Sequence, residues 1–193
     1  MAVSMRFDAQ IGRTGAAKAN VGNAISYNQT QDGFLGKVQK AMDRMSELSV
    51  LAQDVTKSDS DRTLYNTEFQ QLGSYITNVA GKDFNGVSLF SGATQNVTID
   101  SEGGTFGMSG VNLGAAAYNG ATTATVSTTT AAAAALTAVK TAITQLASDR
   151  ASVGAMRTRL NYTEEQLGVL KDNLTASNSR IKDVDVAEES TQF

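Results

Sequence analysis

A seven-residue repeat of apolar residues runs through the last third of the chain and constrains its fold more than any other feature. An unbroken apolar repeat of this period is typical of a helix that packs lengthwise against another helix. The chain of 193 residues contains no proline, so nothing in its composition interrupts such a helix. We expect one helix over about residues 131–187, roughly 80 Å long at 1.5 Å per residue. Its predicted packing residues are Val139, Leu146, Val153, Leu160, Leu167, Leu174 and Ile181.

The positions that would form a second apolar row on this helix are polar instead. This pattern favours a helix in a small bundle with one solvent-facing flank over an isolated two-stranded coiled coil. The polar positions are Arg150, Arg157, Glu164, Lys171 and Asn178.

Two further helices are expected in the first half of the chain. Apolar residues alternate spacings of four and three over residues 34–55 and again over 65–79, and the polar run 57–61 between them offers helix N-cap side chains. Glycines weaken the helix prediction for residues 6–24, although alanines there favour it. The predicted packing residues of this half are Val38, Met45, Phe69, Leu72 and Ile76.

Residues 82–130 have a different pattern. Asn85-Gly86 is a turn signal, and residues 96–99 and 105–108 flank a Glu-Gly-Gly turn in the manner of a β-hairpin. Residues 115–130 are mostly Ala, Thr, Gly and Asn, which predicts a surface loop. The expected fold class is therefore mainly α, an elongated antiparallel bundle of long helices with a small β-hairpin excursion. Its segments are the two-helix half 1–90, the hairpin and minimal variable loop 91–130, and the long helix 131–193.

Composition excludes several classes of function. The chain has no Cys and no His, so it lacks disulfides, thiol nucleophiles, Cys-ligated zinc and the usual general base. Its net charge of -3 argues against nucleic-acid binding, and it has no apolar run long enough to span a membrane. We therefore expect a structural or binding protein, not an enzyme, with no catalytic, cofactor-binding or metal site. The acidic residues Asp183, Asp185, Glu188 and Glu189 are interpreted as a solvated helix end.

Five segments, in this order and spacing, give the chain its resemblance to bacterial flagellins. They are residues 23–30 (NAISYNQT), 44–52 (RMSELSVLA), 84–87 (FNGV), 160–163 (LNYT) and 179–189 (SRIKDVDVAEE). The resemblance implies that residues 6–187 form the conserved rod domain of a filament subunit, with a minimal variable region at about 91–130. A hook–filament junction protein of the same superfamily is the alternative.

The resemblance also implies partners and a location. The partners would be other flagellin subunits, and the location would be the extracellular flagellum, reached by the flagellar type III route without a cleaved signal peptide. Flagellins carry terminal helical segments that build the inner tube, hold the export signal and dock the export chaperone. Both segments are expected to be missing here, which would make the chain a trimmed fragment with weakened chaperone binding that is monomeric or weakly associated in solution.

A receptor contact is the last expectation from the resemblance. Arg44, Leu48 and Glu68 match the positions at which flagellins contact Toll-like receptor 5. Arg44 and Leu48 are four residues apart and share a helix face, and an Arg beside an apolar anchor is typical of an interface hot spot. Leu48 would insert partly into an apolar groove of the receptor. In the alternative interpretation Leu48 is a packing residue of the helix seam and Arg44 is its solvated neighbour.

Overall fold

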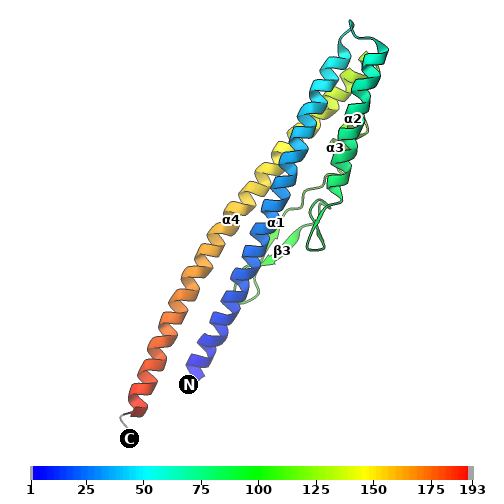
Figure 1. The fold of residues 1–193 in the computed structure, drawn as a ribbon. Helices are drawn as coiled ribbons and strands as arrows, with labels where there is room; N and C mark the ends of the chain where they lie inside the picture. Colours follow the sequence, from blue (N-terminus) through cyan, green and yellow to red (C-terminus); the bar gives the residue numbers. More distant parts are fainter. Residues whose placement is uncertain (1, 191–193) are drawn as a thin grey trace. The chain divides into compact units, whose positions relative to one another are not determined.

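Long helices make up most of the chain (Figure 1). The structure is a computed structural model that describes residues 2–190, with side chains described for residues 3–182. Helix α1 (Ala2–Gln53) has 52 residues and helix α4 (Thr129–Ser190) has 62, while α2 (Asp59–Ala80) and α3 (Ala116–Thr122) are shorter. The prediction of a mainly α fold built on long helices is confirmed. The uncertain stretch 6–24 and the predicted helix 34–55 belong to one continuous helix.

The chain divides into two compact units, and each unit contains segments from the start, the middle and the end of the sequence. The three expected segments 1–90, 91–130 and 131–193 therefore each contribute to both units. Unit 1 consists of Met1–Ser26, Gln95–Met108 and Met156–Phe193, and unit 2 consists of Tyr27–Thr94 and Ser109–Ala155.

In unit 1, α1 runs antiparallel to α4, and long polar side chains of α4 lie over glycines of α1. Lys171 Nζ lies 3.6 Å from the point that a Cβ would occupy at Gly15, and Glu164 Oε1 lies 3.9 Å from the same point at Gly22. Glycine lowers helix propensity, but it leaves room for a neighbouring side chain. The glycines that weakened the helix prediction thus lie where α4 side chains approach α1.

Two members of the predicted polar row contact α1. In unit 2, Arg150 donates from Nε to Asp32 at 2.9 Å and from Nη1 to Gln39 at 2.7 Å. In unit 1, the amide nitrogen of Asn178 donates to Asp8 at 2.6 Å, and Asn178 is buried. The expected solvent-facing flank is therefore wrong at Arg150 and Asn178, because their polar groups find polar partners on the opposite helix.

Two short hairpins lie between α2 and α4, where one was expected. Asn85 and Gly86 join the first pair of strands, and both have the positive φ values of 52° and 78° that a two-residue hairpin turn requires. Gly103, with φ of 90°, lies in the turn of the second hairpin. The antiparallel pairs are β1 (Asp83–Phe84) with β2 (Val87–Ser88), and β3 (Gln95–Thr98) with β4 (Thr105–Met108).

Side chains of α1 fix the segment that contains the first hairpin within unit 2. The hydroxyl of Tyr27 donates to the backbone oxygen of Ser88 at 2.7 Å. One turn later, the side-chain nitrogen of the buried Gln31 donates to the backbone oxygen of Leu89 at 2.6 Å. Buried carbonyls need such partners, so the two polar side chains stabilise the return of the chain along α1.

The expected surface loop over residues 115–130 contains helix α3 instead. Tyr118 is fully buried, and its hydroxyl donates to Asp149 of α4. A Cβ at Gly73 of α2 would lie 2.7 Å from the backbone oxygen of Thr122, so only glycine admits α3 at this distance. The prediction of a loop failed because small residues carry little apolar mass and yet allow close backbone packing.

Candidate interaction site on helices α1 and α2

An ion pair joins α1 to α2 on the surface of unit 2. Arg44 donates from Nε to Glu68 Oε1 at 2.7 Å and from Nη2 to Glu68 Oε2 at 3.0 Å, which is a two-bond fork. Its Nη1 also donates to Glu47 at 2.9 Å. The guanidinium of Arg44 holds the pKa of Glu68 below its usual value, and both side chains remain exposed. The two polar members of the predicted receptor-binding set therefore lie together.

The third member of that set lies in the interior. Leu48 is 0% exposed in the core between helices. The insertion of Leu48 into a receptor groove therefore has no exposed side chain to make it, and this detail of the expectation is corrected. Arg44 and Glu68 are the members of the set that a partner meets at the surface.

The predicted packing residues fall into two groups by exposure. Nine of the twelve are buried, and the three that are partly exposed are Leu72, Leu174 and Ile181. The nine buried residues are Val38, Met45, Phe69, Ile76, Val139, Leu146, Val153, Leu160 and Leu167.

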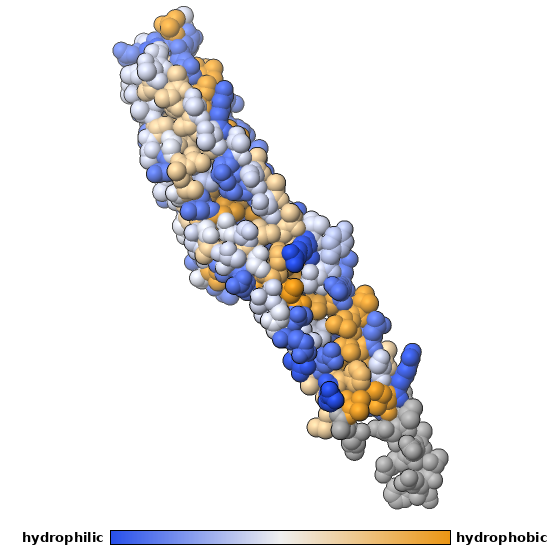
Figure 2. Space-filling model, turned by 180° about the vertical axis from the view of Figure 1, so that it is seen from behind, coloured by the Kyte–Doolittle hydropathy of each residue, from blue (hydrophilic) through white to orange (hydrophobic). Residues whose placement is uncertain are grey.

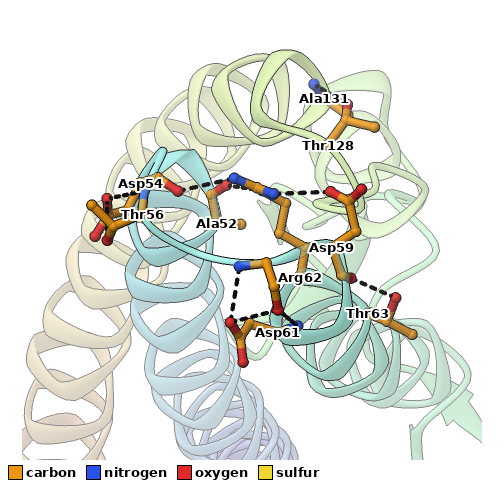
Figure 3. Close-up of polar contacts among 10 residues, drawn as sticks. Ala52, Asp54, Thr56, Asp59, Asp61, Arg62, Thr63, Thr128 and Ala131 are labelled. Atoms are coloured by element: carbon orange, nitrogen blue, oxygen red, sulfur yellow. Dashed lines mark hydrogen bonds and ion pairs between the residues drawn. The ribbon is translucent and has the colours of Figure 1, made fainter.

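A buried arginine organises the turn between α1 and α2 (Figure 3). The side chain of Arg62 is only 8% exposed and donates from Nε to the backbone oxygen of Ala52 at 3.0 Å and from Nη2 to that of Asp54 at 2.9 Å. Its Nη1 pairs with Asp59 at 2.9 Å. The last carbonyls of a helix lack partners within that helix, so Arg62 supplies them together with a favourable positive charge.

The same turn contains a complete capping box. Ser58 is the N-cap of α2, its hydroxyl accepts from the backbone nitrogen of Asp61, and Asp61 in turn accepts from the backbone nitrogen of Ser58 at 2.9 Å. This backbone hydrogen bond is the main reason that the pKa of Asp61 lies below its usual value. The polar run was expected to cap a helix, and Ser58 does so.

Sequence reasoning missed the role of Arg62. One signal was present, because Arg62 stands in the first turns of α2, where a positive charge opposes the helix dipole. A cation at that position indicates a partner outside its own helix. The partner atoms are backbone oxygens, and no side-chain pattern in the sequence reveals them.

Other expected features concern metal ions, membranes and the acidic end. Among the described residues, no three acidic side chains come close enough together to hold a metal ion. No described helix has the length and apolar character needed to cross a membrane. The acidic residues from Asp183 to Glu189 lie outside the residues whose side chains are described.

Comparisons with known proteins agree with this architecture. The family model of the bacterial flagellin N-terminal helical region matches residues 1–95, and that of the C-terminal helical region matches residues 136–193. A flagellin of Halalkalibacterium halodurans is 30% identical over 204 residues, covering 100% of this chain and 73% of that protein. Flagellin FlaB2 of Treponema pallidum is 29% identical, covering 100% of this chain and 74% of that protein.

Solved structures show the same relationship. The crystal structure of Bacillus cereus flagellin has a TM-score of 0.69 at 25% identity and covers 77% of this chain and 88% of that one. A putative flagellar hook-associated protein from Vibrio parahaemolyticus has a TM-score of 0.78 at 14% identity and covers 92% of this chain and 95% of that one, a likeness of fold alone. With both family models and the Halalkalibacterium relative in agreement, the chain belongs to the bacterial flagellin family.

Proposed function

We propose that this chain is a structural subunit of the bacterial flagellar filament, where copies pack through helical surfaces to serve motility. The observation that carries the proposal is that the two family models match α1 and α4, the helices that pair with each other within each unit. Several relatives bear the name of flagellar filament core protein, among them proteins of Treponema phagedenis and Brachyspira hyodysenteriae. The chain then acts outside the cell and leaves it through the flagellar type III route without a cleaved signal peptide.

A chimera tests this function. This chain replaces the matching region of the Halalkalibacterium halodurans flagellin, which it covers to 73%, and the product is expressed in a strain without its own flagellin. We expect filaments in electron micrographs and restored swimming. A chimera that unfolds cooperatively, and so is folded, but builds no filament contradicts the proposal.

The junction role remains the alternative, and the fold does not separate it from a filament subunit. The likeness to the Vibrio hook-associated protein concerns the fold, which both classes share. The position of the protein along the flagellum distinguishes the two roles, since a junction protein occupies only a short zone next to the hook.

A second function is that of a ligand for Toll-like receptor 5. The exposed fork between Arg44 and Glu68 supports it, because charged groups at the rim of a contact can exchange their partner for one on the receptor. Leu48 then contributes by supporting the helix that carries Arg44. The test is a titration of the receptor ectodomain with the unmodified chain, and the absence of binding at micromolar concentration removes this function while the filament role stands.

A further inference from the structure

A filament that grows without closing requires two different surfaces on every copy, because a heterologous contact repeats from one copy to the next. Exposed large apolar residues mark candidate surfaces, since a partner that covers them removes apolar area from water. The two largest groups of such residues lie at the α1–α2 turn of unit 2 and on α4 in unit 1.

The first surface, which we call the tip, consists of Val50, Leu51, Val55 and Leu64 around the α1–α2 turn. Val55 is 85% exposed and Leu64 is 68% exposed. Figure 2 shows an orange hydrophobic group beside blue hydrophilic atoms at the end of the molecule where this turn lies. The bonds of Arg62 and the capping box hold the turn, so the tip presents its apolar side chains in a fixed arrangement.

Carboxylates surround the apolar residues of the tip. Asp54 precedes Val55 directly, and Asp59 and Asp61 follow in the first turn of α2. The hydrogen bond from the backbone of Thr56 holds the pKa of Asp54 below its usual value, so this group is charged at neutral pH. The tip is therefore an apolar surface with an acidic rim.

The second surface, which we call the α4 stripe, is a row of exposed residues on α4 within unit 1. Tyr162 is 69% exposed and Val169 is 62% exposed, and their spacing of seven places them on one helix face. The charged members of the row are arginines, one near each end. In order, the α4 stripe consists of Arg159, Tyr162, Gln166, Val169, Asn173 and Arg180.

We propose that the tip of one copy docks on the α4 stripe of a second copy. The apolar residues Val55 and Leu64 pack on Tyr162 and Val169, while the carboxylates of the tip face the arginines of the stripe. The two surfaces are complementary in charge and alike in apolar character, and the fixed turn reduces the entropy lost on docking. The inference rests on the proposed filament function and names the contact that such a filament uses.

The chain contains no cysteine, so single introduced thiols report the contact without background. Val55→Cys protein is mixed with Val169→Cys protein at high concentration and treated with a short bismaleimide, and the cross-linked pair is measured by mass spectrometry. The matched control replaces Val55→Cys by Val87→Cys, since Val87 is also an exposed valine of unit 2. Sedimentation velocity of the unmodified chain records self-association in parallel.

We expect the 55–169 pair to form about tenfold more than the 87–169 control, and to decrease when salt screens the charges. Val55→Asp should reduce self-association about tenfold, because docking would bury a charge, whereas Val87→Asp should not. Equal yields of the two cross-linked pairs overturn the inference. If the chimera builds filaments and the yields are equal, the docking is wrong and the filament function stands. If the chimera builds none, the filament function fails, whatever the cross-linking shows.

Discussion

Arg62 of α2 donates from Nε to the backbone oxygen of Ala52 at 3.0 Å, so one helix caps the end of the helix before it. The last turn of α1 has no basic residue of its own. The cation that complements its dipole therefore comes from α2, together with hydrogen bonds to two backbone oxygens. This contact explains how a short polar turn holds a fixed geometry.

Replacement of Arg62 by Ala should lower the free energy of unfolding by about 2–3 kcal/mol. The change leaves buried backbone oxygens without partners and removes charge-assisted hydrogen bonds. Urea unfolding followed by circular dichroism measures the effect. Arg180→Ala is the control, since Arg180 is exposed and should change stability by less than about 0.5 kcal/mol. Equal stability of the two variants would remove Arg62 from this role.

A charge at Leu160 should abolish cooperative unfolding. Leu160 is fully buried in the row of packing residues on α4, and a buried charge without a partner costs several kcal/mol. Tyr162→Asp is the matched control, because Tyr162 lies two residues away and is exposed. Thermal melts should show a lost or strongly lowered transition for Leu160→Asp and an ordinary one for Tyr162→Asp. An unchanged melt for Leu160→Asp is incompatible with its place in the core.

Loss of either partner of the surface fork should weaken receptor binding without unfolding the chain. Arg44→Ala and Glu68→Ala are each expected to reduce affinity for the Toll-like receptor 5 ectodomain by about 5- to 150-fold, as the loss of a charged hydrogen bond does. Their melting temperatures should change little, because exposed ion pairs contribute about 0–1 kcal/mol. Affinity equal to that of the unmodified chain would place the fork outside the contact.

Leu48→Ala separates packing from direct contact. Leu48 is fully buried, so its truncation should lower the melting temperature by creating a cavity. Affinity and melting temperature should therefore fall together. A variant that keeps its melting temperature and loses receptor binding would contradict the buried position of Leu48.

The stability of unit 2 should decrease in acid. The pKa of Asp61 lies below its ordinary value of 3.8 mainly because of the hydrogen bond from the backbone of Ser58. A carboxyl whose pKa is lowered by folding stabilises the fold above its unfolded pKa, and this contribution is lost as the pH falls through the folded value. Unfolding free energy should therefore be level between about pH 7 and 5 and should decrease below about pH 4. Asp61→Asn should reduce the slope of that decrease, and an unchanged slope would contradict this role for Asp61.

The long helices could be predicted because their signal is repeated many times. Each member of the row from Val139 to Leu167 gives the same period, so no single substitution obscures it. The capping role of Ser58 and the turn at Asn85-Gly86 were also visible, since local backbone chemistry selects these residues.

Features that depend on contacts between distant segments could not be predicted. Helix α3 owes its position to Gly73, where the absence of a side chain admits the backbone of Thr122, and small residues in a sequence do not indicate their neighbours. Likewise, Asn178 looked like a solvated position because its partner Asp8 is 170 residues away. Leu48 fitted both a packing role and a receptor contact, and only its burial in the structure separated them.

The most direct test of the filament role is the position of this protein along the flagellum. An antibody raised against the chain, visualised with gold in electron micrographs of cells that express the chimera, measures that position. The filament role predicts gold along the full length of long filaments. Gold confined to a short zone beside the hook, with the rest of the filament unlabelled, would contradict it and would favour the junction role.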